Sequence, residues 1–262
     1  MSKTLYYKTK EEIELIRLSS LLVGEALAEI GKIIKPGITT LSLDKVAEEF
    51  ILDNQALPAF KGYSGFPNTL CVSVNSQVVH GIPGKYELKE GDIISVDCGV
   101  LKNEYFGDSA YTFAVGEVKS EILNLLKVTK ESLYKAIEKT VVGNRLGDIS
   151  EAVQAHAEKN GFSIVRELVG HGIGQNLHEA PEVPNYGKRG HGLKLQEGLV
   201  IAIEPMVNFG KKTIVQEKDV WTIRTADNLP SAHFEHTVAI GKDKADILST
   251  FEYIEEALKV RN

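Results

Sequence analysis

The spacing of apolar residues near the N-terminus predicts two helices. Between residues 10 and 31, apolar side chains recur at positions 13, 16, 18, 21, 22 and 27, which is the spacing of one face of an amphipathic helix. Thr9 precedes this stretch, and we expect it to be the N-cap. The sequence KPG at 35–37 ends the pattern, and helical periodicity resumes over residues 39–54.

Further along the chain, predicted strands alternate with predicted helices. A loop rich in glycine, proline and aromatic residues, PAFKGYSGFPN at 58–68, comes first and is a candidate binding surface. Helical periodicity predicts helices over 121–139, 148–160 and 251–260, with Asp148 and Gly161 capping the second. Composition and alternation predict strands over 69–75, 92–100, 104–115, 198–205, 212–216, 220–225 and 233–241.

The order of these elements indicates the fold class. Pairs of helices alternate twice with antiparallel strands, which predicts an α+β protein with two similar halves, although no sequence repeat is detectable. Neither a break in composition nor a linker separates the halves, so we expect residues 1–262 to form a single domain.

The stretch VGHGIGQNLHEAPEVPNY at 169–186 carries two histidines, His171 and His178, among glycines and prolines. Glycines favour a loop or a close approach of backbone segments, and prolines discourage regular structure. They stand at 170, 172 and 174 and at 181 and 184. We therefore expect a shaped loop. Taken alone, each histidine is better explained by a hydrogen bond to nearby backbone than by metal ligation.

Composition and charge narrow the classes of partner. With 43% hydrophobic and 25% charged residues, the chain is typical of a globular protein. The net charge of -6 and the lack of a lysine- or arginine-rich run argue against nucleic acid or a membrane as partner. The sequence contains neither a signal peptide nor a membrane span, so we expect a cytoplasmic protein. Cys71 and Cys98 are expected to be buried, reduced thiols.

Two aspartates fall on neighbouring predicted strands. If the hairpin turns at Lys102 and Asn103, Asp97 lies directly opposite Asp108. Like charges so placed destabilise a sheet, and two close carboxylates stay ionised together only beside a cation. Two exposed strand aspartates explain these strands equally well. The other face of the first strand is apolar, formed by Ile94, Val96, Cys98 and Val100.

Two glutamates in the second half of the chain also stand in apolar strands. Glu204 ends the run LVIAIEPM, and Glu235 lies within HFEHTVAI. An unpaired buried glutamate is costly, and for each one a lysine or arginine partner is as good an explanation as metal ligation. Together with the two aspartates and one histidine, they form an oxygen-rich set suited to a pair of divalent ions.

Five motifs in this order give the chain a family resemblance. They are VVHGIP at 78–83, Asp97 with Asp108, HGIGxxLHExP at 171–181, IEPMV at 203–207 and EHT at 235–237. This set resembles the methionine aminopeptidase family of the short bacterial type, type I, in peptidase family M24. The resemblance covers essentially the whole chain. It implies the pita-bread fold, in which two pseudosymmetric halves of antiparallel strands are backed by helices, with a metal site between them.

The resemblance also implies a ligand set for two divalent ions, of cobalt, manganese, iron or zinc, whose identity the sequence leaves open. Asp97 would chelate one ion, and His171 and Glu204 would complete the shell of the other. Asp108 and Glu235 would bridge the two. A hydroxide held between the ions would then attack the first peptide bond of a substrate whose N-terminal residue is methionine.

Catalytic roles follow from the same resemblance. Glu204 would take the proton of the attacking group, and His178 would stabilise the oxyanion together with a metal ion. His80 would contact the scissile amide nitrogen. Without the resemblance, a structural histidine is the better interpretation of His80.

A methionine-specific site needs an apolar slot lined by aromatic and soft side chains. By resemblance, the residues of this slot are Tyr63, Phe66, Cys71, Leu177 and Trp221, with Phe60 at the rim. Packing on the core explains the aromatic members equally well without the resemblance. Ser64, Phe66 and Leu177 depart from the usual family residues, so we expect altered specificity or inhibitor affinity at the pocket mouth, with the chemistry intact.

Rival functions remain open from the sequence. An aminopeptidase P or prolidase would share the fold and all five ligands, but those enzymes typically carry an additional N-terminal domain, for which this chain has no room. A binding module on the same fold, or a protein in which the metal is only structural, would not need the complete ligand set with two further histidines. We expect a monomer that acts on peptides with N-terminal methionine, such as nascent chains at the ribosome.

Overall fold

The computed structural model describes residues 4–261, and its helices match the sequence pattern closely. Thr9 caps the first helix as predicted: its hydroxyl accepts a hydrogen bond from the backbone N–H of Glu12, whose carboxylate accepts one from the N–H of Thr9. The prediction that Asp148 caps the start of its helix was wrong, because that helix begins two residues earlier. Asp148 lies in the third helical position, and its carboxylate accepts a 2.7 Å hydrogen bond from the N–H of Arg145. The helices are α1 (Lys10–Ile33), α2 (Thr40–Asp53), α3 (Ser120–Ile137), α4 (Leu146–Lys159) and α5 (Glu252–Arg261), with a 3-10 turn at Tyr63–Gly65.

The strands form four sheets whose pairings are all antiparallel. One sheet joins β1 (Leu57–Pro58), β2 (Leu70–Val74), β4 (Ile93–Lys102) and β5 (Tyr105–Ala114). A five-stranded sheet has the order β15-β14-β9-β7-β8, with β15 at Asp246–Ile247, β14 at His236–Ala239, β9 at Val200–Ile203, β7 at Val169–Gly172 and β8 at Glu179–Pro184. The two smaller sheets are β13-β10-β6 (Ser231–His233, Met206–Asn208, Ser163–Ile164) and β11-β12-β3 (Ile214–Gln216, Ile223–Thr225, Gln77–Val79).

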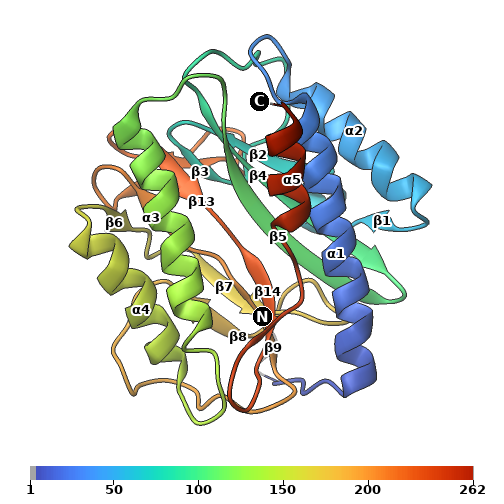
Figure 1. Ribbon diagram of the computed structural model, residues 1–262, viewed down its shortest axis with the longest axis vertical. Helices are drawn as coiled ribbons and strands as arrows, with labels where there is room; N and C mark the ends of the chain where they lie inside the picture. Colours follow the sequence, from blue (N-terminus) through green and yellow to red (C-terminus); the bar gives the residue numbers. More distant parts are fainter. Residues whose placement is uncertain (1–3, 262) are drawn as a thin grey trace.

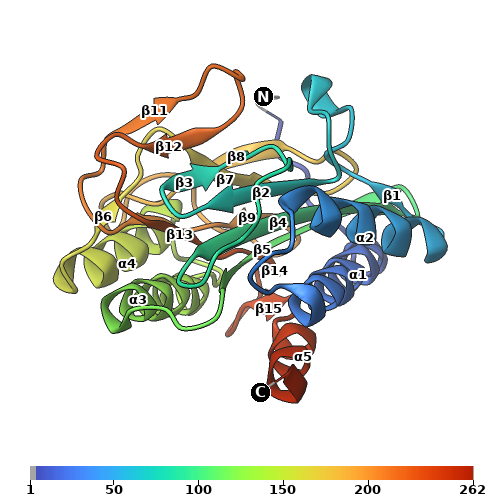
Figure 2. The same ribbon diagram turned by 90° about the horizontal axis from the view of Figure 1, so that it is seen from above.

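The elements are arranged in two halves, each with a pair of helices packed on one side of its strands (Figure 1). In one half α1 packs on β4 and β5 and α2 packs on β1 and β2, and α3 and α4 cover the strands of the other half. Figure 2 shows the helices on one side of the strands and the hairpin β11–β12 on the other. The C-terminal helix α5 packs against α1.

Strand β5 joins the halves because it lies beside residues 233–237. The N–H of Glu235 donates a 2.9 Å hydrogen bond to the carbonyl of Ala110, and the hydroxyl of Ser109 donates a 2.7 Å one to the carbonyl of Glu235. The hydroxyl of Thr237 donates to the carbonyl of Asp108 over 2.8 Å. Side chains of β5 and of the segment around Glu235 therefore face the same space.

Two predictions about regular structure were wrong. Residues 169–186 are not one loop, because β7 and β8 form an antiparallel pair there, and both prolines lie in β8. The alternative expectation for the glycines holds: a Cβ on Gly170 would overlap with the carbonyl of Ala202, and one on Gly172 with that of Ala180. The predicted strand 233–241 is broken at 234–235, between β13 and β14.

The apolar face predicted for β4 is confirmed, since Ile94, Val96, Cys98 and Val100 are fully buried in the main core. The expectation for the cysteines is also confirmed, because Cys71 and Cys98 are buried and not bridged. None of the helices described between residues 4 and 261 is long and apolar enough to cross a membrane.

Candidate metal centre

A cavity of about 180 Å³ lies where the two halves meet, and all the residues predicted for the site line it. Carboxylate and imidazole groups line one part of the cavity, and apolar side chains line the other part. The lining residues are Phe60, Tyr63, Ser64, Phe66, Cys71, His80, Asp97, Asp108, His171, Leu177, His178, Glu204, Trp221 and Glu235.

Three of the predicted ligands form a tight group. Asp108, His171 and Glu235 are buried, and one donor atom of each lies within 4.8 Å of the other two. They come from β5, from β7 and from the break between β13 and β14. Because hydrogen bonds tie β5 to residues 233–237, the closeness of Asp108 and Glu235 is set by the backbone of the fold.

The predicted opposition of Asp97 and Asp108 was wrong by two residues. In the hairpin of β4 and β5, Asp97 is paired with Ala110, and Asp108 with Gly99. The turn residues are Asn103 and Glu104, with φ values of 50° and 66°, and such a left-handed pair is typical of a two-residue hairpin turn. The two aspartates are therefore diagonal neighbours on one face, which still brings their carboxylates together.

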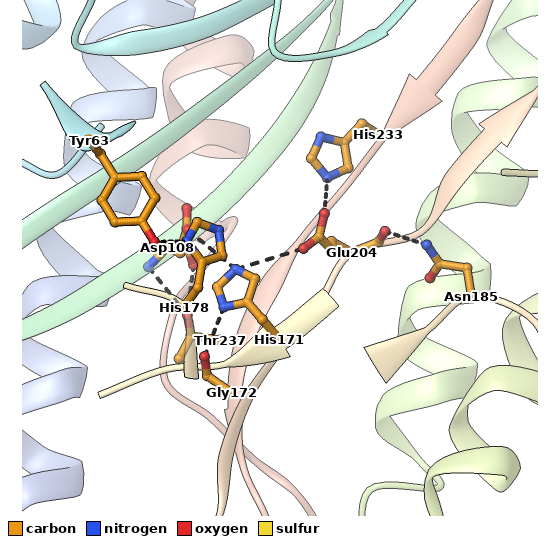
Figure 3. A network of polar contacts seen from close by, with 9 residues as sticks. All are labelled: Tyr63, Asp108, His171, Gly172, His178, Asn185, Glu204, His233 and Thr237. Atoms are coloured by element: carbon orange, nitrogen blue, oxygen red, sulfur yellow. Dashed lines mark hydrogen bonds and ion pairs between the residues drawn. The ribbon is translucent and has the colours of Figure 1, made fainter. Parts of the chain in front are cut away.

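The ring of His171 is oriented for ligation. Its Nδ1 is 2.9 Å from the carbonyl oxygen of Gly172, and because a carbonyl can only accept, Nδ1 carries a proton and Nε2 is the ring atom that a metal ion would take. That Nε2 lies 3.9 Å from Oδ2 of Asp108 and 3.8 Å from Oε1 of Glu204 (Figure 3). The pairing of β7 with β8 is irregular at His171, a feature that often re-aims a side chain next to a functional site.

The carboxylates carry perturbed pKa values. Burial raises the pKa of Asp97 to about 7, and the charge of Glu204 adds to the rise while that of His233 opposes it. Burial also raises the pKa of Glu204 to about 7, against the opposing influence of His171. The pKa values of Asp108 and Glu235 are raised by burial and by the neighbouring carboxylates. Without a cation, these acids could not all stay ionised at neutral pH.

Two carboxylate oxygens also lack partners. Oδ1 of Asp97 and Oδ1 of Asp108 are buried and have no hydrogen-bond partner among residues 4–261. A buried acceptor without a partner is costly unless a donor or a cation approaches it. With the free Nε2 of His171, these atoms form an oxygen-rich donor set of the kind that hard or borderline divalent ions take up. The residues present therefore fit a metal centre.

The two further histidines of the cavity are neutral at pH 7. Burial lowers the pKa of His80 to about 4, with a contribution from the charge of His233. Burial lowers the pKa of His178 to about 3, helped by the charges of His171 and His80. His80 has φ 59°, a left-handed conformation that is uncommon outside glycine and often marks a functional position.

The position of His178 is defined by two rings. Its Nδ1 lies 2.9 Å from the hydroxyl of Tyr63, and its ring centroid is 4.3 Å from that of His171. If Tyr63 donates to Nδ1, the proton of the neutral ring sits on Nε2, which then acts as a donor. His178 is thus held beside the ligand group.

The apolar part of the cavity comes from segments far apart in the sequence. The rings of Phe66 and Trp221 meet edge to face with centroids 5.2 Å apart. Phe60, Cys71 and Leu177 are buried beside them in a second hydrophobic cluster. Ser64, which we expected to alter the pocket mouth, also lines the cavity.

Sequence reasoning missed His233. It is 1% exposed, and its Nε2 lies 3.6 Å from Oε2 of Glu204. Strand alternation would have placed residues 233 and 235 on one face, but the motif EHT begins at Glu235 and does not include His233. It missed Lys8 as well, which forms a buried ion pair with Glu179, the residue next to His178.

The fold and the cavity define a metal-dependent hydrolase. The family model of metallopeptidase family M24 matches residues 14–242, and the chain belongs to this family. It is 52% identical to a methionine aminopeptidase from Clostridium perfringens over 92% of this chain and 97% of that one. It also resembles the crystal structure of a methionine aminopeptidase from Thermotoga maritima, with a TM-score of 0.93, 44% identity and coverage of 94% of this chain and all of that one.

The likeness to a proline-specific relative shows the fold. A prolidase from Pyrococcus horikoshii superposes with a TM-score of 0.77 but is 22% identical, and this chain covers 64% of it. The likeness to both groups confirms the pita-bread fold expected from the sequence motifs.

Proposed function

We propose that this protein is a methionine aminopeptidase whose cavity is the active site. The protein removes the N-terminal methionine from peptide chains by hydrolysing the first peptide bond. The observation that carries the proposal is the convergence of five potential ligands and an apolar slot in one small cavity. The high identity to methionine aminopeptidases along nearly their whole length supports the same activity.

The proposed centre holds two divalent ions of cobalt, manganese, iron or zinc. Asp97, Asp108, His171, Glu204 and Glu235 would hold these ions, with Asp97 on one side of the centre, His171 and Glu204 on the other, and Asp108 and Glu235 between them. When bound, such ions polarise the scissile carbonyl and make a water molecule acidic enough to ionise near neutral pH. The unpartnered oxygens of Asp97 and Asp108 support this assignment.

The protein side chains orient the substrate and move the proton. Glu204 takes a proton from the attacking water and passes it to the leaving amine. His178 donates from Nε2 to the oxygen of the scissile carbonyl, since Tyr63 occupies its Nδ1. His80 contacts the scissile amide nitrogen. Both histidines are neutral at pH 7.

The methionine side chain occupies the apolar part of the cavity. Phe66, Trp221, Cys71 and Leu177 surround an unbranched thioether with rings and soft groups, which favour sulfur and exclude charge. Tyr63 also walls the slot, and Phe60 lies at its rim. Because Tyr63 also contacts His178, the pocket and the catalytic group share one side chain, and correct filling of the slot aligns the peptide bond.

We propose further that one catalytic domain acts as a monomer in the cytoplasm, on nascent chains at the ribosome. The acidic net charge of -6 supports protein substrates over nucleic acid.

The test is hydrolysis of Met-Gly-Met-Met and of an Arg-Pro-Pro peptide by metal-stripped protein, before and after Mn²⁺ or Co²⁺ is added. Metal-dependent release of methionine from the first peptide alone is expected. Cleavage of only the second would assign the chain to the proline-specific branch, and no cleavage with any metal would favour a binding module.

Variants of two buried aspartates sharpen this experiment. Asp108→Asn, in the ligand group, should abolish metal-dependent turnover. Asp92→Asn is the matched control, because Asp92 is 7% exposed and accepts hydrogen bonds from Asn75 and Tyr86 outside the cavity. Equal loss in the two variants would show that the aspartate at 108 acts only through stability.

A further inference from the structure

His233 is a buried imidazole aimed at the proposed metal centre. It ends β13, is 1% exposed, and its Nε2 has no hydrogen-bond partner among the residues that the structure describes. Its backbone is anchored to β5: the hydroxyl of Thr112 donates to the carbonyl of His233 over 2.7 Å and accepts from its N–H over 3.0 Å. The ring therefore starts from a fixed point of the sheet.

The carboxylate of Glu204 lies between two imidazole rings (Figure 3). Oε1 is 3.8 Å from Nε2 of His171, and Oε2 is 3.6 Å from Nε2 of His233. The two oxygens thus face different histidines. His171 belongs to the group whose donor atoms lie within 4.8 Å of one another, and both Glu204 and His233 lie outside it. Oε1 of Glu204 therefore faces a member of that group, and Oε2 faces His233.

The main chain of Glu204 is held in place separately from its carboxylate. The carbonyl of Glu204 accepts a 2.9 Å hydrogen bond from the side chain of Asn185, which holds the main chain but not the carboxylate. A carboxylate that can rotate freely loses that rotational freedom when it binds an ion, which weakens binding. A hydrogen-bond donor on its second oxygen restricts the rotation before the ion binds.

We propose that His233 is a positioning residue for the metal centre, whose Nε2–H holds Oε2 of Glu204 so that Oε1 is presented beside His171. The inference rests on the proposed function, because it assigns Glu204 to the metal. Closing the 3.6 Å gap needs a shift of about half an ångström to reach hydrogen-bond distance. His233 supports a ligand in this arrangement and does not itself bind the ion.

The test measures affinity for Mn²⁺ by chelator competition, which needs no turnover. His233→Leu keeps an apolar group of moderate size but removes the donor, and it should weaken binding about 10–100-fold, the usual effect of losing such a support. His233→Gln keeps an N–H donor and should retain most of the affinity. His156→Gln is the control, since His156 bonds to Glu131 on the far helices and should bind as the wild type does.

A double-mutant cycle connects the effect to Glu204. In a Glu204→Gln background, His233→Leu should cause no further loss of Mn²⁺ affinity. Asp97 is the other acid whose charge interacts with His233, so a loss that persists in this background would overturn the assignment to Glu204. If His233→Leu does not fold, His233→Asn takes its place, because the shorter amide fails to reach Oε2.

The outcomes separate the inference from the proposed function. If the wild type binds Mn²⁺ and releases methionine while His233→Leu binds Mn²⁺ equally well, the inference is overturned and the function stands. If the wild type neither binds the ion nor cleaves the peptide, the proposed function fails first. Loss of affinity in His233→Leu with recovery in His233→Gln supports the inference.

Discussion

The ion pair of Lys8 with Glu179 connects the segment before α1 to the residue that follows His178. The side chains are 4% and 3% exposed. The other oxygen of Glu179, Oε1, accepts a hydrogen bond of 3.2 Å from the N–H of Asn176. Leu177 and His178 lie between these two attachment points, so the pair holds the turn that brings both side chains to the cavity.

Lys8→Met removes the cation and leaves the carboxylate of Glu179 buried. Breaking a buried pair in this way costs about 3–5 kcal/mol, because the remaining charge is neither solvated nor paired. For a chain of this size about 1 kcal/mol corresponds to about 2 °C, so Tm should fall by about 6–10 °C. Displacement of His178 by about 1 Å should lower kcat/KM by up to about 100-fold.

The assay is thermal unfolding of the metal-loaded protein together with peptide hydrolysis. Adding Glu179→Gln to Lys8→Met removes the unpaired charge and should recover part of the lost stability. Lys32→Met is the matched control, because the pair of Lys32 with Glu29 is 53% and 35% exposed and should contribute less than about 1 kcal/mol. A Lys8→Met protein that unfolds at the same temperature as Lys32→Met would refute the reasoning.

Three further changes test the architecture of the site. Gly170→Ala forces a methyl group against the carbonyl of Ala202 and should cost about 1–3 kcal/mol in urea unfolding; an unchanged free energy would show that β7 and β9 can separate freely. Leu177→Ala removes a side chain that is 1% exposed and should cost about 2–5 kcal/mol, with KM for methionine peptides rising more than kcat falls. Burial would raise the pKa of Asp219, but hydrogen bonds from the Thr222 hydroxyl and two backbone amides hold it below the ordinary value. Wild type should therefore be more stable than Asp219→Asn at pH 7 and lose that advantage as the pH falls below about 3.9, the ordinary aspartate value; a difference that persists at pH 2 contradicts this.

Local pattern was sufficient for the elements that are repetitive or capped. The spacing of apolar residues in α1 and the Thr9 cap needed only the period of the helix and a hydroxyl at its start. The burial of Cys98 and its neighbours followed from alternation along β4. The site residues were found together because short motifs with fixed spacing carry a family's ligands.

Local pattern failed where a contact between distant segments determined the backbone. The hairpin turns at Asn103 and Glu104, so its register differs by two residues from the predicted one. The prediction missed this turn because the pair Asn-Glu lacks the glycine of the Asn-Gly signal. Residues 169–172 form a strand despite their glycines because the missing Cβ atoms let neighbouring backbones approach. Glycine usually interrupts a strand, but here its lack of a side chain is what allows the strand to form.

The sequence by itself determined the helix and strand periods, the apolar faces and the identity of the chemical groups available to bind a metal. Only the tertiary structure decided how those groups meet. Glu235 reaches Asp108 because β5 is hydrogen-bonded to residues 233–237, and Lys8 meets Glu179 across 171 positions of the chain. His233 faces Glu204 because β13 pairs with β10, with His233 opposite Met206, two residues after Glu204. Such contacts depend on which distant segments pair or pack together, which leaves no periodic signal in either segment.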